Sequence, residues 1–397
     1  MAKHLPRKAE VVVVGGGVVG LSIAGFLAEG GREVVLLDAG GPAGSTANAG
    51  SLHVQMQSRF LRMYPEQVPA LESGLHLYPK AVDFWHDLER KLNADFGMKM
   101  TGGLMVAETE DQLDFLRRKA ARERALGLDS EILERSDLDR VAPYIGPAVI
   151  GAELCANEGK LNPLQANAAI RGWAQSCGVA IHDGVHVAAL SPQGSGFIVE
   201  TGGGKVHADQ VVIAAAYGSR TLLEPFGYEL AIEAEPLHVN ITERAAPFIG
   251  HLVQHAERPI TLKQFASGHV VIGGGWPANL GSERGFPTVE LASIIGNATL
   301  AQHIVPTVSN LHIIRTWAGV NTPTDGKGIL GPVEGVPGLF AAIPGDAGYT
   351  LGPLCASLVA ECVLGKKPAE DIGPYSPARF RTPAAARPKA DAHLSAL

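Results

Sequence analysis

The stretch VVVVGGGVVGLSIAGFLAEGGREVVLLDAG, residues 11–40, decides the fold. Residues 11–14 form a short β-branched run of the kind found in parallel strands that are covered on both faces. Residues 18–30 predict a helix, and residues 33–37 predict the next strand. The order of strand, glycine-rich turn, helix and strand is typical of a βαβ unit that binds a dinucleotide.

Three glycines directly after the first strand give the spacing G-x-G-x-x-G. Gly15 allows the tight turn, Gly17 lets a pyrophosphate approach the backbone, and Gly20 lets the helix pack against the strand. Asp38 ends the second strand, where a carboxylate accepts both adenosine-ribose hydroxyls and would repel a 2′-phosphate. The pattern suits either a nicotinamide or a flavin dinucleotide, with a purely structural glycine turn as the alternative.

Length and composition restrict the class of protein further. A chain of 397 residues is too long to fold around one ordinary hydrophobic core. Its net charge of −7, without a long run of one sign, disfavours nucleic acid as a partner. The four cysteines lack C-x-x-C spacing, so we expect reduced thiols and no metal site. No run reaches the ~18 apolar residues of a membrane span, and no signal-peptide cleavage site is recognisable. These features predict a cytoplasmic protein, with peripheral contact with the inner membrane left open.

The remaining chain predicts an α/β fold with an α+β second domain. Helical periodicity covers residues 78–92, 110–127 and 163–178. Residues 197–200 and 205–207 predict a hairpin, residues 211–216 a second core strand, and residues 230–314 an antiparallel sheet. The predicted organisation is a Rossmann-like cofactor-binding domain over residues 8–78, 146–222 and 312–380, an interleaved substrate or partner domain over residues 79–145 and 223–311, and a flexible tail over residues 381–397.

Two further stretches favour a flavin. Residues 41–53, GPAGSTANAGSLH, are small and hydroxyl-bearing where a nicotinamide enzyme usually continues its βαβ alternation. Residues 337–365 predict a strand, a glycine loop and a helix opened by Pro353 and closed by Gly365, with Cys355, Leu358 and Cys362 on a core face. Main-chain N–H groups from Gly348 to Leu351 can face the flavin N1/O2 edge, with a structural helix cap as the alternative.

At this point the sequence resembles the FAD-dependent D-amino acid oxidase family, which includes glycine oxidase, sarcosine oxidase and D-amino acid dehydrogenase. The resemblance rests on VVVVGGGVVGLSIAGFLA, Asp38, GSTANAG, VVIAAAYGS, RTWAGVNTPTDGKGILGP and GYTLGP, which occur in the right order from residue 10 to about residue 380. It implies FAD in a fold of the glutathione-reductase type. The residues expected to bind FAD are Gly15, Gly17, Val18, Val19, Gly20, Asp38, Ala39, Ser45, Thr46, Gly50, Ser51, Leu52, Val187, Gly348, Tyr349, Thr350 and Leu351.

Within that family, STANAGSLHVQMQSRF and GYTLGP look most like the β subunits of bacterial opine oxidases (octopine or nopaline dehydrogenases). Relatives of this type include dye-linked proline and hydroxyproline dehydrogenases. The resemblance implies a hetero-oligomer with a larger α subunit and a small ferredoxin-like subunit. It also implies FMN and an iron–sulfur cluster at or in the partner subunits. Electrons are then expected to leave to an acceptor other than oxygen.

Two positions depart from the family pattern. Many members carry Arg after the W-[AS]-G triplet, where it clamps a substrate carboxylate, but this chain has Asn321 there. A bulkier substrate held elsewhere is therefore favoured over a small D-amino acid. Some relatives attach FAD through a His in a GSTWHAAG-type motif, and Asn48 at the aligned position predicts non-covalent FAD.

The reaction expected from the resemblance removes a hydride from the carbon that bears a neutral amine, delivers it to flavin N5 and leaves an imine that hydrolyses. The candidates for substrate contact are His53, Tyr349, Asn321 and Lys263, and a structural role is the alternative for each. The leading hypothesis is a dehydrogenase of secondary amines such as octopine or nopaline. The alternatives are a D-amino acid, glycine or sarcosine oxidase, a D-hydroxyproline dehydrogenase, or a non-catalytic flavin-bearing subunit.

Overall fold

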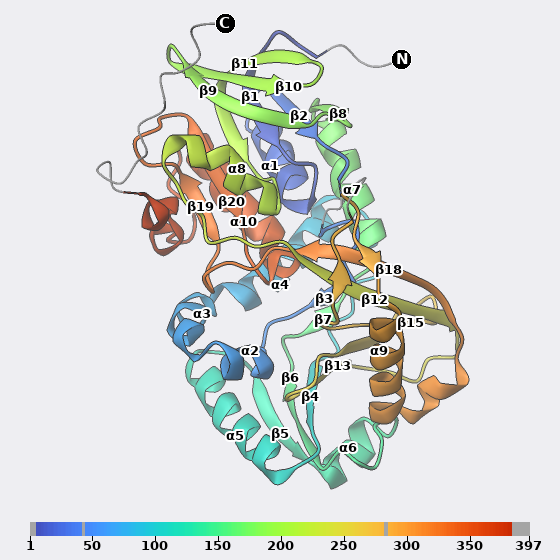
Figure 1. Ribbon diagram of the computed structural model, residues 1–397. Helices are drawn as coiled ribbons and strands as arrows, with labels where there is room; N and C mark the ends of the chain where they lie inside the picture. The colour runs from blue at the N-terminus through green and yellow to red at the C-terminus, as the bar shows by residue number, and fades with distance from the viewer. Residues whose placement is uncertain (1–4, 42–43, 282–284, 383–397) are drawn as a thin grey trace, which may run out of the picture.

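The computed structural model describes residues 5–41, 44–281 and 285–382. Two eight-stranded sheets dominate the molecule, one in the upper half of Figure 1 and one in the lower half. The helices are α1 (Val18–Glu29), α2 (Ser58–Met63), α3 (Val68–Gly74), α4 (Leu77–Lys91), α5 (Glu110–Ala125), α6 (Arg135–Val141), α7 (Pro163–Ser176), α8 (Ser219–Leu223), α9 (Leu291–Ile304) and α10 (Gly348–Val363).

The first sheet has a parallel centre assembled from separated parts of the chain. Its main path runs β19–β20–β11–β1–β2–β8, with β9 and β10 attached beside β11. All neighbours from β20 to β8 are parallel, whereas β19, β10 and β9 pair in antiparallel fashion. The strands are β1 (Lys8–Val14), β2 (Val34–Asp38), β8 (Ala180–Asp183), β9 (Val187–Gln193), β10 (Gly196–Thr201), β11 (Gly204–Ile213), β19 (Ile329–Pro332) and β20 (Leu339–Ile343).

Both faces of strand β1 are buried, as its continuous apolar run predicts. Val11 and Val13 belong to a core that also includes α1, α4, α7 and α10. Val12 and Val14 belong to a second core, made with residues of β9, β10 and β11 on the opposite face. This burial fixes the end of β1, and with it the place where the glycine turn begins.

The second sheet runs β18–β12–β15–β14–β13–β4–β6–β5. It is antiparallel except where β13 lies parallel to β4. The antiparallel sheet predicted over residues 230–314 is confirmed for the strands of that range, but residues 291–304 form helix α9, which was not predicted. Its strands are β4 (Gly103–Ala107), β5 (Ser130–Glu134), β6 (Gly151–Cys155), β12 (Glu235–Arg244), β13 (Leu252–His255), β14 (Thr261–Gln264), β15 (His269–Gly273) and β18 (Ile313–Asn321). Two short ladders complete the structure, β3 (Ser51–Leu52) with β7 (Gly159–Lys160) and β16 (Ala278–Asn279) with β17 (Thr288–Val289).

The two faces of the second sheet have different neighbours. Asn240 on β12 donates to Asn297 of α9, so one face packs against that helix. Trp317 on β18 donates through Nε1 to the carbonyl of Ala47 at 2.8 Å, so the other face meets the small-residue loop. Val239 pairs with Trp317 in register, and side chains alternate along each strand. Val239 and Trp317 therefore lie on the face of the sheet that meets the loop after Asp38.

Most predicted elements are confirmed to within a few residues. The helices expected over residues 78–92, 110–127 and 163–178 are α4, α5 and α7. The hairpin is confirmed by β10 and β11, but residues 205–207 and 211–213 belong to one continuous strand rather than two. That strand ends at Ile213, because the chain then turns through Ala216, whose φ is 51°.

Two strands from ranges expected in the cofactor-binding domain, β6 and β18, pair with the second sheet. The chain thus passes between the two units more often than the predicted domain bounds describe. Those bounds remain a prediction. The predicted tail lies outside the described residues from residue 383 onward. No helix in the described part of the chain combines the length and apolarity that a membrane crossing requires.

Candidate active site

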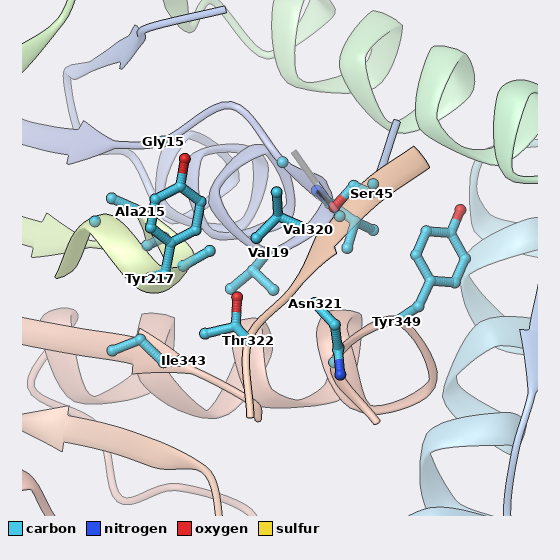
Figure 2. A pocket seen from close by; sticks show the side chains of 18 of the residues that line it. Gly15, Val19, Ser45, Ala215, Tyr217, Val320, Asn321, Thr322, Ile343 and Tyr349 are labelled. Atoms are coloured by element: carbon cyan, nitrogen blue, oxygen red, sulfur yellow. Dashed lines mark hydrogen bonds between the residues drawn. The ribbon is translucent and has the colours of Figure 1, made fainter. Parts of the chain in front are cut away.

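A cavity of about 640 Å³ extends along the carboxyl ends of β1 and β2 and is also lined by residues of β12 and β18 from the second sheet. Its size falls within the range of roughly 300–1,000 Å³ typical of small-molecule sites. Figure 2 shows Tyr217 on one side of it and Tyr349 on the other, with Val19, Thr322 and Asn321 between them. The cavity thus lies at the edge of a parallel sheet where such folds bind their ligands.

The glycine turn after β1 leaves no room for side chains. Gly15 has φ +113°, and a Cβ there would lie 2.3 Å from the carbonyl oxygen of Ala214. A Cβ on Gly20 would lie 1.9 Å from the carbonyl oxygen of Gly15, so helix and turn touch directly. At Gly16 a Cβ would lie 2.6 Å from the Asp38 carboxyl carbon. Gly16, which was not singled out from the sequence, therefore lets the acidic side chain lie beside the turn.

The N-terminus of α1 opens into this cavity without a side-chain cap. Its N-cap is Gly17, and the first turn carries no acidic residue. The N–H of Val18 donates to the hydroxyl oxygen of Ser45 at 2.9 Å, which places the small-residue loop across the helix end. The partial positive charge of the helix end and its free N–H groups favour an anionic group such as a phosphate.

A second helix N-terminus, that of α10, faces the same cavity. α10 begins at Gly348, so the prediction that Pro353 opens it is wrong. Pro353 lies inside the helix and gives no N–H to the carbonyl of Tyr349 four residues earlier. The indole N–H of Trp85 on α4 supplies that donor instead, at 3.2 Å. The helix can therefore extend toward the cavity past its proline.

Asp38 ends β2 at the cavity wall, beside Ala39. Most of the residues expected to bind FAD also line the cavity. These are Gly15, Gly17, Val18, Val19, Asp38, Ala39, Ser45, Ser51, Val187, Gly348, Tyr349 and Thr350.

Five of the expected residues lie outside the lining: Gly20, Thr46, Gly50, Leu52 and Leu351. Gly20 serves the contact between α1 and the turn. A Cβ on Gly50, whose φ is +77°, would lie 2.2 Å from the carbonyl oxygen of Leu161, so this glycine allows a close backbone approach. Leu52 and Leu351 are buried in the core.

Sequence reasoning missed part of the wall. Residues Ala214–Tyr217 follow β11 and line the cavity beside Gly15. The signal for them was the stretch VVIAAAYGS, whose strand predicts a neighbour of β1 but does not show which way the following loop runs. Asn48 also lines the cavity, and its side-chain oxygen accepts from the Gly50 N–H at 2.7 Å.

Of the four candidates for substrate contact, the cavity wall includes His53, Tyr349 and Asn321. The hydroxyl of Tyr349 donates to the side-chain oxygen of Asn167 at 3.0 Å, and Asn167 donates to the carbonyl of Ser45 at 2.8 Å. Burial raises the pKa of the Tyr349 phenol well above its ordinary value. The phenol therefore links α10 to the Ser45 loop rather than presenting a free hydroxyl to a substrate.

Lys263 lies behind the wall rather than in it. Its side chain is fully buried, and Nζ donates to the hydroxyl of Ser51 at 2.6 Å. Burial, with the charge of Lys160 added, lowers the pKa of Lys263 to about 7. Lys263 is thus connected to the cavity through its hydrogen bond to Ser51, which lines it.

Asn321 lines the cavity and is held there by an acidic neighbour. Its side-chain N–H donates to Glu235 at 3.0 Å, across the β12–β18 ladder. Asp346 lies in the same part of the wall. Burial, followed by the charge of Glu235, raises the pKa of Asp346 to about 6, while Thr324 and Asn321 oppose that shift. In the described chain neither carboxylate forms an ion pair with Lys, Arg or His, so this end of the cavity is acidic.

Comparison with known proteins places this architecture in a family. The sequence model described as "DAO: FAD dependent oxidoreductase" matches residues 10–362. The chain belongs to this family. It is therefore an FAD-dependent oxidoreductase, and the prediction of a flavin rather than a nicotinamide cofactor is confirmed.

Individual relatives of this FAD-dependent oxidoreductase carry several names. Glycine oxidase of Geobacillus kaustophilus is 26% identical, with 94% of this chain and 97% of that protein covered. An opine oxidase subunit of Rhizobium meliloti is 26% identical over 94% and 98% of the two chains. The beta subunit of sarcosine oxidase of an Arthrobacter species is 27% identical over 95% and 92%.

Solved structures show the same fold. The glycine oxidase of G. kaustophilus superposes with a TM-score of 0.82 at 24% identity, covering 94% of this chain and 98% of that one. L-proline dehydrogenase from P. horikoshii gives a TM-score of 0.80 at 22% identity over 95% and 98%. The predicted Rossmann-like α/β fold is thus confirmed.

The cavity fits FAD on its own chemistry. Two uncapped helix N-termini and a glycine turn without Cβ atoms can receive the diphosphate and the flavin edge. Asp38 can accept the ribose hydroxyls at the end of β2. The described residues contain no group of three or more His, Cys, Asp or Glu side chains that could hold a metal ion. All four cysteines are free thiols, and burial raises the pKa of Cys355 to about 12.

Proposed function

We propose that this FAD-dependent oxidoreductase oxidises the C–N bond of a secondary amine or amino acid, with opines such as octopine and nopaline as the substrate class. FAD supplies the acceptor for the electron pair of the substrate C–H bond, which leaves as hydride. The imine then hydrolyses. The residues that would hold the cofactor are the glycine turn, Asp38, the Ser45 loop and the N-terminus of α10.

The observation that carries the choice of substrate is the acidic end of the cavity. Asn321 stands where an Arg clamp for a carboxylate is common, and it donates to Glu235 instead. Asp346 is the carboxylate that lines the cavity at this end, and the charge of Glu235 behind it acts on Asp346. A small amino acid whose carboxylate must be bound there would be repelled, whereas a substrate with a cationic or neutral group at that end is accommodated. Octopine and nopaline are arginine derivatives, so their cationic guanidinium group can lie at this end while their carboxylates bind elsewhere.

The relatives support two parts of the proposal. Two proteins of 26% and 24% identity are named as subunits of opine oxidases, and another is named as the beta subunit of a sarcosine oxidase. These names support a hetero-oligomer in which this chain is one subunit, with a larger α subunit and a small ferredoxin-like subunit as the proposed partners. We propose that electrons pass through them, by FMN and an iron–sulfur cluster, to an acceptor other than oxygen.

The deciding experiment is anaerobic bleaching of the flavin in the purified FAD-loaded protein. Octopine, nopaline, proline derivatives, glycine, sarcosine and D-amino acids are compared, alone and with the candidate partner subunits. Bleaching by opines without peroxide formation in air supports the proposal.

The glycine oxidase relative gives one alternative its basis. Bleaching by glycine or a D-amino acid, with stoichiometric peroxide in air, would replace the proposal with an oxidase. Bleaching by hydroxyproline derivatives alone would indicate a D-hydroxyproline dehydrogenase. No bleaching by any amine, with or without partners, would indicate a non-catalytic flavin-bearing subunit.

A further inference from the structure

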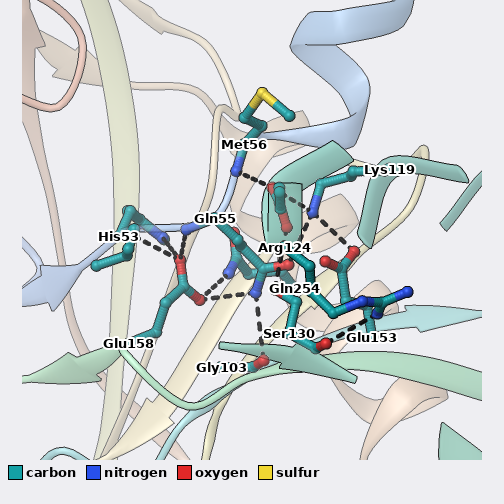
Figure 3. Close-up of polar contacts among 12 residues, drawn as sticks. His53, Gln55, Met56, Gly103, Lys119, Arg124, Ser130, Glu153, Glu158 and Gln254 are labelled. Carbon is teal, nitrogen blue, oxygen red and sulfur yellow. Dashed lines mark hydrogen bonds and ion pairs between the residues drawn. The ribbon is translucent and has the colours of Figure 1, made fainter. Parts of the chain in front are cut away.

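A buried polar network holds the segment that leads away from β3, at residues 53–56 (Figure 3). Three consecutive main-chain N–H groups of this segment donate to carboxylates from the second sheet and its helix. Val54 and Gln55 donate to Oε1 of Glu158 at 2.7 and 3.0 Å, and Met56 donates to Oε1 of Glu123 at 2.6 Å. The network therefore fixes the backbone on which His53 stands.

Glu158 is the carboxylate of this network that lies beside His53. It lies between β6 and β7, and its side chain is fully buried. Its second oxygen, Oε2, accepts from the side-chain amides of Gln55 and Gln254, both at 2.8 Å. In all, its two oxygens accept four hydrogen bonds from neutral donors. A Cβ on Gly103 would lie 1.8 Å from Oε2, so the site needs a glycine there.

His53 connects this carboxylate with the cavity. Its Nδ1 lies 3.8 Å from Oε1 of Glu158, is shielded from solvent, and has no hydrogen-bond partner among the described residues. The same residue lines the cavity, and its Nε2, unlike Nδ1, is not among the buried nitrogens of the described residues that lack a partner. A carboxylate beside one ring nitrogen fixes the tautomer and leaves the other nitrogen as an acceptor.

We propose that His53 takes the proton of the bound substrate ammonium at Nε2 and that Glu158 is the positioning residue that holds the ring with Nδ1–H toward Oε1. In this step an N–H bond of the ammonium breaks, its electron pair stays on the amine nitrogen, and a new N–H bond forms on Nε2. The product is a neutral amine, which can release a hydride, and an imidazolium next to Glu158. The proton-transfer role rests on the proposed function, whereas the orientation of the ring does not.

The same network contains a matched control. Glu123 lies on α5 and holds the next N–H of the segment, but its carboxylate pairs with Lys119 and not with His53. Other titratable groups near the segment include Lys119 on α5, Glu153 on β6, Lys160 on β7 and Lys263 on β14. Glu158→Gln and Glu123→Gln thus disturb the same backbone segment from neighbouring positions, and one of the two faces the histidine.

The first test reads the tautomer of His53 by nitrogen NMR of the oxidised, FAD-loaded protein with labelled histidine. We expect a predominant Nδ1–H form in the unsubstituted protein and in Glu123→Gln. We expect Glu158→Gln to lose that preference, with Nε2–H populated instead. The same tautomer in all three proteins, or Nε2–H in the unsubstituted protein, would overturn the positioning role of Glu158.

The second test is the pH profile of anaerobic flavin bleaching with whichever amine reduces the unsubstituted protein. Near neutral pH, His53→Gln should slow bleaching by about 10²–10⁴-fold, the usual contribution of a general base. The deficit should shrink as the pH rises, because the substrate then loses its proton to solvent. Glu158→Gln should show a smaller deficit of the same form, and Glu123→Gln none.

A deficit that persists equally at every pH, or no deficit at all, would overturn the role of His53 as proton acceptor. An unsubstituted protein that no amine bleaches would refute the proposed function and the proton transfer with it. The tautomer measurement would then still decide whether Glu158 orients the ring.

Discussion

Trp85 and Tyr349 are joined twice, through their rings and through the main chain. The rings stack with centroids 5.3 Å apart and an interplanar angle of 20°, and the indole N–H donates to the carbonyls of Tyr349 and Thr350. The first of these carbonyls is the one that Pro353 leaves without a helical partner. One side chain on α4 thus stabilises the end of α10 that faces the cofactor cavity.

Replacing this indole should destabilise the protein. Trp85→Phe keeps an aromatic ring but leaves a buried carbonyl unpaired, which costs about 1–3 kcal/mol. The free energy of unfolding in urea measures the effect. The control is Trp173→Phe, which removes an indole N–H that donates to Glu29, a carboxylate 36% exposed and able to turn to water. An equal loss in both variants would contradict the role assigned to Trp85.

Gly16→Ala should weaken FAD binding. The new Cβ would lie 2.6 Å from the Asp38 carboxyl group, which must move away from the position where it can accept the ribose hydroxyls. We expect the affinity to fall about tenfold or more, which corresponds to about 1.4 kcal/mol. Flavin fluorescence titration of the cofactor-free protein gives the Kd. Gly172→Ala on α7, where a Cβ meets nothing within 4 Å, should leave the Kd unchanged.

The buried Lys263 predicts a particular dependence of stability on pH. Its pKa is about 7 in the folded chain, below the ordinary value of 10.5. Between these two values the unfolded chain binds more protons, so stability rises with pH over that window, by at most about 1.4 kcal/mol per pH unit. Below about pH 7 both states are protonated, and the full penalty of burying the charge remains.

Lys263→Met should therefore be more stable than the unsubstituted protein near neutral pH, and its stability should rise less steeply toward alkaline pH. Chemical unfolding at a series of pH values measures both quantities. Parallel curves for the two proteins would show that the ammonium stays charged in the folded state.

The cluster around Lys119 should respond unequally to two substitutions. Burial raises the pKa of Glu153 against the charge of Lys119, which favours the neutral carboxyl. Glu153→Gln should then change stability little. Lys119→Met leaves the buried carboxylate of Glu123 without its cation and should destabilise the protein by about 3–5 kcal/mol. Urea unfolding of both variants tests the difference, and a large loss in Glu153→Gln would show that its carboxyl is ionised.

Local rules were enough to predict the elements that position the cofactor. The strand, glycine turn and helix of residues 11–30 follow from β-branched runs and glycine spacing, and the structure places the turn where Asp38 adjoins it. The start of the helix after residue 347 was harder to predict. Proline reliably marks the start of a helix only when no other donor replaces its N–H. Here the replacing donor is Trp85, which lies more than 260 residues away from Tyr349 in the sequence, so local rules could not predict it.

The buried network of Figure 3 could not be predicted from the sequence either. The stretch that forms α5 is rich in charge and predicts a solvated outer face, yet Lys119 and Glu123 are fully buried. Nothing in their spacing distinguishes them from exposed ion pairs, because their partners come from residues 55, 56 and 153 on other elements. Likewise, the sequence does not show that a Cβ on Gly50 would meet the carbonyl oxygen of Leu161, and the FAD contact expected of this glycine stays a prediction.

The cofactor cavity takes its walls from segments far apart in the sequence, with the end of strand β1 near residue 14 and the start of helix α10 near residue 350. During synthesis on the ribosome, the first βαβ unit emerges long before its last wall exists. A nascent chain that stops short of α10 therefore lacks the wall that residues 347–350 supply to the cavity.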